Sequence, residues 1–87
     1  MALFYFDVLI GGKLFKDAAG MDLPDIDAAE EVAVTAAAAI ARDTLLPSRN
    51  TGTISIQVRD AHGLPVLNSA VTMHTTRVKP PANTGDG

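Results

Sequence analysis

The chain has 87 residues, of which 47% are hydrophobic and 20% charged, a composition that excludes an intrinsically disordered chain and predicts one small globular domain. Its formal net charge of −3 argues against a nucleic-acid-binding protein, because such proteins neutralise phosphates with clustered Lys and Arg. The absence of cysteine excludes disulfides, thiolate metal sites and a cysteine nucleophile.

The first predicted element is a β-hairpin. A run rich in aromatic and β-branched residues covers positions 2–10, Gly11-Gly12 follow, and a second apolar run begins at once. Two glycines between apolar runs predict a two-residue turn, because both turn positions need a positive φ. The pairs that this turn predicts are Ile10 with Lys13, Val8 with Phe15, and Asp7 with Lys16. The last of these is an expected ion pair on the solvent side, while the core side holds Phe4, Phe6, Val8 and Phe15.

An alanine-rich helix is predicted after a connector at residues 18–24. Asp25 or Asp27 can cap it, and Asp27 with Glu30 is close to a capping box. Alanine favours the helical state, and Pro47 ends the helix near Leu46. The helical periodicity predicts a core-facing stripe of Ala29, Val32, Ala33, Ala36 and Ile40.

Two further strands are predicted beyond the helix. Residues 53–59 alternate between polar and apolar side chains, with Ile54, Ile56 and Val58 facing inward. Residues 60–63 form a turn, and a last strand runs from about Val66 to Val78. Residues 79–87 are predicted to be a disordered tail, which leaves residues 1–78 as the single domain.

The order strand, strand, helix, strand, strand predicts an α+β fold of ββαββ type. A right-handed crossover from the second to the third strand leaves room for the first strand between them. We therefore expect a four-stranded antiparallel sheet in the order 2-1-3-4, with one helix across one face.

Two stretches of the chain carry a family pattern. The first contains an aromatic strand, a glycine turn, an Asp-x-x-Gly connector and a Leu-Pro-Asp helix start; its residues here are Phe4-Tyr5-Phe6-Asp7-Val8, Gly11, Leu14, Asp17, Gly20, Leu23-Pro24-Asp25 and Ala28-Ala29. The second is the Val-x-Asp-x-x-Gly motif, here Val58-Arg59-Asp60-Ala61-His62-Gly63. In these residues the chain resembles a family of short bacterial domains of unknown function. That family usually has His where this chain has Asp7, and the resemblance implies a fold without supplying a catalytic residue.

The sequence offers few groups for catalysis or metal binding. His62 lies in the predicted turn and His74 far along the last strand, so we do not expect them to act together within one subunit. The acidic residues between Asp17 and Glu31 do not have EF-hand spacing, and Gly11-Gly12 opens no helix, so it is not a phosphate loop. We expect no enzymatic activity, no metal and no cofactor.

Apolar residues that the predicted core does not use suggest that the protein acts by binding a partner. A second helical stripe, expected on the side away from the sheet, consists of Val34, Ala37, Ala38, Ala41 and Leu45. Small side chains permit close contact between the helices of two copies, although alanine is also favoured anywhere on a helix. The outer face of the sheet offers a rival apolar patch, made by Leu3, Tyr5, Leu9 and Leu14.

We therefore expect a homo-oligomeric module for protein interaction or regulation, whose partner is a second copy or another protein. One alternative is a small-ligand-binding domain that uses the polar outer sheet face, with Asp7, Lys16, Gln57 and Arg59. Another is an antitoxin-like regulator associated with nucleic acid. Residues 1–10 have no basic start and are too short to cross a bilayer, so we expect a cytoplasmic protein without a signal peptide.

Overall fold

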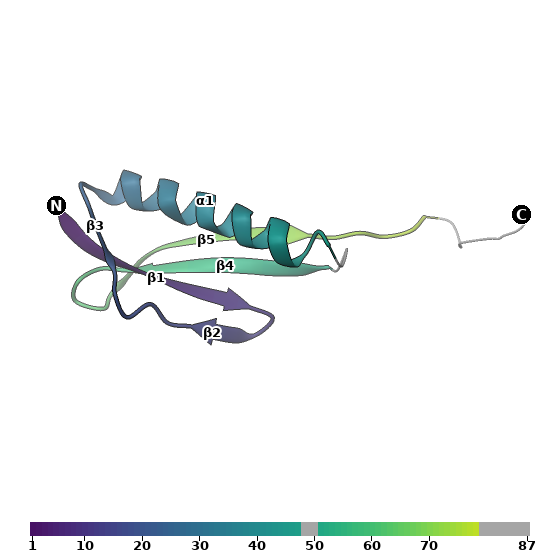
Figure 1. The fold of residues 1–87 in the computed structure, drawn as a ribbon, viewed down its shortest axis with the longest axis horizontal. Helices are drawn as coiled ribbons and strands as arrows, with labels where there is room; N and C mark the ends of the chain where they lie inside the picture. Colours follow the sequence, from purple (N-terminus) through teal and green to yellow (C-terminus); the bar gives the residue numbers. More distant parts are fainter. Residues whose placement is uncertain (48–50, 79–87) are drawn as a thin grey trace, which may run out of the picture.

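The structure is a computed structural model that describes residues 1–47 and 51–78. One helix lies across one face of a five-stranded antiparallel sheet, so the predicted α+β class is confirmed (Figure 1). In chain order the elements are β1 (Ala2–Ile10), β2 (Lys13–Phe15), β3 (Met21–Leu23), α1 (Ile26–Thr44), β4 (Gly52–Arg59) and β5 (Pro65–Met73). The tail predicted at residues 79–87 lies outside the described residues.

The sheet is organised around its first strand. The hydrogen-bonded order is β2-β1-β4-β5, and β3 pairs with β1 as well. The four predicted strands correspond to β1, β2, β4 and β5 and follow one another in the predicted order 2-1-3-4. The prediction is wrong in the strand count, because β3 is a fifth strand that pairs with β1 beside this order. Residues 21–23 were expected in a connector; they form a strand because the first residues of β1, Ala2 to Phe4, offer them backbone partners.

The first hairpin has the predicted turn. Gly11 and Gly12 both have positive φ, and Val8 lies opposite Phe15 in an antiparallel pair. The strand β2 ends there, so Lys16 is not part of the ladder. The placement of Phe15 in the core is wrong: the residue is 48% exposed, because α1 packs over β4 and β5, whereas β2 lies at the opposite edge of the sheet.

The helix begins where its cap predicts. The carboxylate of Asp25 accepts the backbone N–H of Ala28 at 2.9 Å, and the helix ends at Thr44, shortly before Pro47. Its buried face is one row of residues four apart, consisting of Ala29, Ala33, Ala37 and Ala41 and continued by Leu45. The small side chains of this row allow the helix to lie close to the sheet.

The core is thin. Its largest fully buried side chains are those of Ile54, Ile56 and Val58, all from β4. The helix-facing residues of β5, by contrast, are only partly buried; they are Leu67, Ser69, Val71 and Met73. One flank of the hydrophobic layer thus stays open at β5. No helix within the described ranges is long and apolar enough to cross a membrane.

Candidate functional site

The outer sheet face contains a buried ion pair that the sequence reasoning missed. Arg59 donates from Nε to Oδ2 of Asp7 at 2.6 Å and from Nη2 to Oδ1 at 3.0 Å. The Asp7 side chain is only 4% exposed, and the guanidinium carbon of Arg59 lies 4.8 Å from the ring centre of Tyr5. The predicted Asp7–Lys16 pair is wrong, because β4 brings Arg59 beside Asp7 while Lys16 follows the end of β2.

Asp17 joins this pair to the connector between β2 and β3. Its carboxylate accepts the backbone N–H of Phe6, which lies between the parts of β1 that pair with β2 and with β3. It also accepts N–H groups from Ala19 and Gly20, while its own N–H donates to Asp7. The Asp17 carboxylate therefore takes the place of the backbone carbonyl that a neighbouring strand would otherwise offer to the N–H of Phe6.

The ionisation of both carboxyl groups follows from these contacts. Hydrogen bonding to Arg59 lowers the pKa of Asp7 below its ordinary value of 3.8, against the opposing effect of burial. The pKa of Asp17 is lowered as well, first by the N–H of Phe6 and then by those of Gly20 and Ala19. Both groups are carboxylates at neutral pH, and both are bound by groups of the same chain: Asp7 by Arg59, and Asp17 by backbone N–H groups.

The predicted ligand face is therefore only partly available. Asp7 and Arg59 bind each other, whereas Lys16 and Gln57 are exposed. A hollow of about 460 Å³ lies beside Gln57, and its other lining residues are Pro65, Leu67 and Asn68. Gln57 lies opposite Asp7 in the β1–β4 ladder, so the structure keeps it beside the charged pair, but the polar groups of Asp7 and Arg59 are occupied by each other.

The residues of the predicted dimer stripe lie in two different environments, one buried and one exposed. The assignment of Ala37, Ala41 and Leu45 to the outward side is wrong, because all three are buried against the sheet of the same chain. Val34 and Ala38 remain exposed. The rival patch on the outer sheet face is partly covered, because the backbone at Gly20 lies against the side chains of Leu3 and Tyr5. Of its other two residues, Leu9 is half-buried and Leu14 is exposed.

A shallow apolar groove lies between α1 and β5. Ala38, Arg42 and Leu46 line it from the helix side, and Val71 and Met73 line it from the strand. Its volume is about 280 Å³, below the ~300–1,000 Å³ of typical small-molecule pockets. Leu46 is 57% exposed here, which leaves a large apolar side chain in solvent at the open flank of the core.

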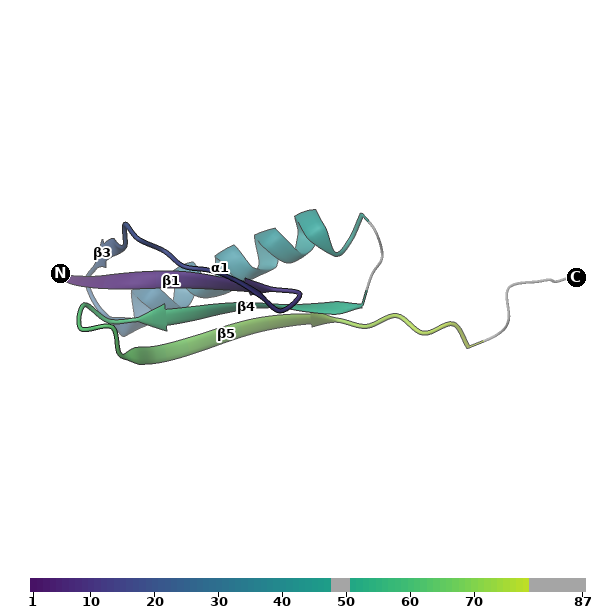
Figure 2. The same cartoon turned by 90° about the horizontal axis from the view of Figure 1, so that it is seen from below.

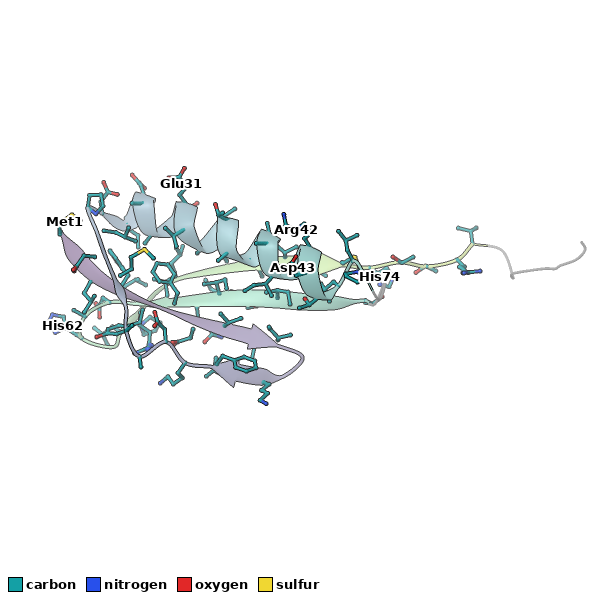
Figure 3. The ribbon with its side chains drawn as sticks, viewed as in Figure 1. Met1, Glu31, Arg42, Asp43, His62 and His74 are labelled. Atoms are coloured by element: carbon teal, nitrogen blue, oxygen red, sulfur yellow. The ribbon has the colours of Figure 1, made fainter. Side chains whose placement is uncertain are left out.

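The two histidines lie at opposite ends of the sheet (Figure 3). His62 is exposed in the turn after β4, where its backbone N–H donates to the carboxylate of Asp60. His74 follows β5, and its ring forms a hydrogen bond with Thr76. Within residues 1–47 and 51–78, no group of three His, Asp or Glu side chains is arranged to hold a metal ion.

These features define a small two-layer α+β domain with internally paired charges and one open apolar flank. Residues 3–72 match the model of a domain of unknown function (DUF6894), and the chain belongs to that family. The expected resemblance to a family of unknown function is confirmed. No curated protein and no solved structure matches the chain.

Proposed function

We propose that the chain is a non-enzymatic interaction module that forms a homodimer through the flank where α1 and β5 meet. The observation that carries this proposal is the apolar groove beside half-buried β5 side chains, with Leu46 exposed in it. A second copy that covers this flank would remove apolar area from water and complete a thin core. A cytoplasmic location is part of the proposal and is supported by the absence of cysteine.

The pairing of the charged groups supports a binding role without catalysis. Asp7 and Arg59 are occupied by each other, and Asp17 by backbone N–H groups, so none of the three is free to act on a substrate. The same contacts reduce the support for the ligand-binding alternative on the outer face. The net charge of −3 argues against the alternative associated with nucleic acid.

Light scattering coupled to size exclusion tests the proposal across a micromolar to millimolar concentration range. We expect a dimer for the natural chain and a monomer for Leu46→Glu, because the new carboxylate would be buried in the contact. Leu14→Glu is the matched control: Leu14 is also exposed, but it lies in β2 at the other end of the strand order. A natural chain that stays monomeric overturns the proposal, and a dimer lost only in Leu14→Glu moves the contact to the outer sheet face.

A further inference from the structure

The strand β5 ends the hydrogen-bonded order of the sheet, and Figure 2 shows no helix or strand of residues 1–47 and 51–78 on its far side. It is nine residues long and contains no charged residue. Natural edge strands are usually protected by charges, prolines or bulges, because an unprotected edge pairs with other chains. Here Pro65 and the irregularity at Val58/Arg59 both lie at one end of the strand, so the rest of the edge has neither.

The register of the sheet identifies the backbone groups on this open edge. The N–H of Phe6 donates to Asp17 and not to β4, so the pair of Phe6 with Val58 is a non-hydrogen-bonded one. Hydrogen-bonded pairs alternate along each ladder, so β4 bonds to β5 through Ile54, Ile56 and Val58. The residues of β5 whose N–H and C=O groups point away from β4 are therefore Asn68, Ala70 and Thr72.

An antiparallel strand is a suitable partner for this edge. Two copies of β5 related by a two-fold axis perpendicular to the sheet would run antiparallel, and each would offer the same donors and acceptors to the other. Because β5 is uncharged, this arrangement places no like charges opposite each other across the new pair. Both helices would then lie on the same face of one continuous sheet, on either side of the joined strands.

The charges of α1 agree with that arrangement. Its first half carries the acidic residues Asp27, Glu30 and Glu31, whereas its last turn, beside the groove, carries Arg42 together with the Asp43 that pairs with it. Figure 3 shows Glu31 and Arg42 in opposite halves of the helix. The two-fold axis makes the helices antiparallel, so the acidic half of each helix faces the Arg42 half of the other.

From this geometry we infer that β5 pairs antiparallel with β5 of a second copy of this chain and extends the sheet across both. The inference rests on the proposed homodimer and specifies its contact. The helix flanks close over the groove, and the exposed edge groups of Asn68, Ala70 and Thr72 become hydrogen-bonded. Each copy then covers the partly buried face of β5 in the other.

Amide hydrogen exchange measured residue by residue, at high and low protein concentration, tests this contact. In the dimer we expect Asn68, Ala70 and Thr72 to be protected as well as their neighbours Leu67, Ser69 and Val71; on dilution, only the neighbours stay protected. A dimer in which the first three amides exchange fast overturns the inference but leaves the proposed function in place. Protection that persists in a monomer also overturns it, because the chain itself would then cover the edge.

A pair of proline variants provides a second test. Ala70→Pro removes an outward-facing N–H without removing a hydrogen bond to β4, so the monomer keeps its ladder. We expect its dimer dissociation constant to rise by at least about tenfold. In Leu14→Pro the replaced N–H also faces outward, at the β2 edge, because the hydrogen-bonded pairs there are Val8 with Phe15 and Ile10 with Lys13. An Ala70→Pro dimer as tight as the Leu14→Pro dimer contradicts the pairing.

Discussion

The Asp7–Arg59 pair shows how one charged residue can be stabilised on the exposed side of a sheet. The Asp7 carboxylate accepts two hydrogen bonds from Arg59 and one from the backbone of Asp17, which satisfies the charge despite its burial. The remaining side of the guanidinium lies against the ring of Tyr5. Together these contacts connect β1, β4 and the connector after β2.

Removing this charge should weaken the fold. In Asp7→Asn the side chain keeps its size but loses its charge, and we expect the free energy of unfolding to fall by about 2 kcal/mol, as for a hydrogen bond to a charged group. Asp43→Asn removes the same charge from the exposed Arg42–Asp43 pair and should change stability by less than about 0.5 kcal/mol. Urea denaturation of both variants checks this, and equal losses in the two would contradict a special role for Asp7.

The lowered pKa values of Asp7 and Asp17 predict how stability depends on pH. Each group has a lower pKa in the folded chain than its ordinary value of 3.8, so the folded state binds fewer protons than the unfolded state. The stabilisation is therefore complete above that value and is lost as pH falls through the lower folded values. Urea denaturation at pH 6 down to pH 2 should show a falling unfolding free energy. In Asp17→Asn the fall should be shallower, and an unchanged slope would exclude Asp17 as a source.

The connector between β2 and β3 depends on a residue without a side chain. Gly20 has a φ of +76°, and a Cβ at this position would lie 2.9 Å from Cδ1 of Leu3 and 3.2 Å from the carbonyl oxygen of Phe4. Gly12 also has a positive φ, but nothing lies within 4 Å of a Cβ there. Gly12→Ala should cost about 1 kcal/mol for its backbone conformation alone. Gly20→Ala should cost at least about 1 kcal/mol more, because Leu3 and β1 must also shift. Thermal unfolding of the two variants compares them.

The buried row of alanines predicts which helix positions tolerate a larger side chain. Ala37 is fully buried against the sheet, so Ala37→Leu should destabilise the chain by about 1–3 kcal/mol through overpacking. Thr35 lies in the same part of the helix but is exposed, and Thr35→Leu should change stability by less than about 0.5 kcal/mol. Urea denaturation measures both. If Ala37→Leu leaves stability unchanged, Ala37 does not face the sheet, and the opposite side of the helix does.

The local sequence predicted the elements better than the contacts between them. The Gly11-Gly12 turn, the aspartate cap of the helix and the alternation around Ile56 depend on near neighbours, and the structure confirms all three, with Asp25 as the cap of the two candidates. The buried helix face was predicted only in part: Ala29 and Ala33 are buried as expected, but Ala37 and Ala41 are buried as well. Alanine on every side of the helix leaves only a weak periodic signal. The strand at residues 21–23 also has no signal of its own, since it depends on a partner in β1.

The charged site was harder to predict for the same reason. Asp7 and Arg59 are 52 positions apart, and only the register of β1 against β4 brings them together. A signal was present, because both residues were assigned to the outer face of strands expected to be neighbours. The hairpin register alone favoured Lys16, which is near in the sequence but beyond the end of β2.

At the scale of the whole molecule, the proposed dimerisation should be visible as a dependence of stability on concentration. Mass action stabilises the folded state of a chain that binds only its own folded copies. The melting temperature of the natural chain should therefore rise as its concentration is raised, whereas that of Leu46→Glu should stay constant. Calorimetry over a hundredfold range of concentrations measures this. A natural chain whose melting temperature does not respond is not a dimer in that range.

The distance in sequence between Asp7 and Arg59 also affects biosynthesis. The ribosome delivers Asp7 long before Arg59, because 52 positions separate them. Until then the early part of the nascent chain has a carboxylate that cannot leave water without its counter-ion. We therefore expect β1 to take its final place only after β4 has emerged, and a prematurely terminated polypeptide lacking Arg59 to be open to proteolysis.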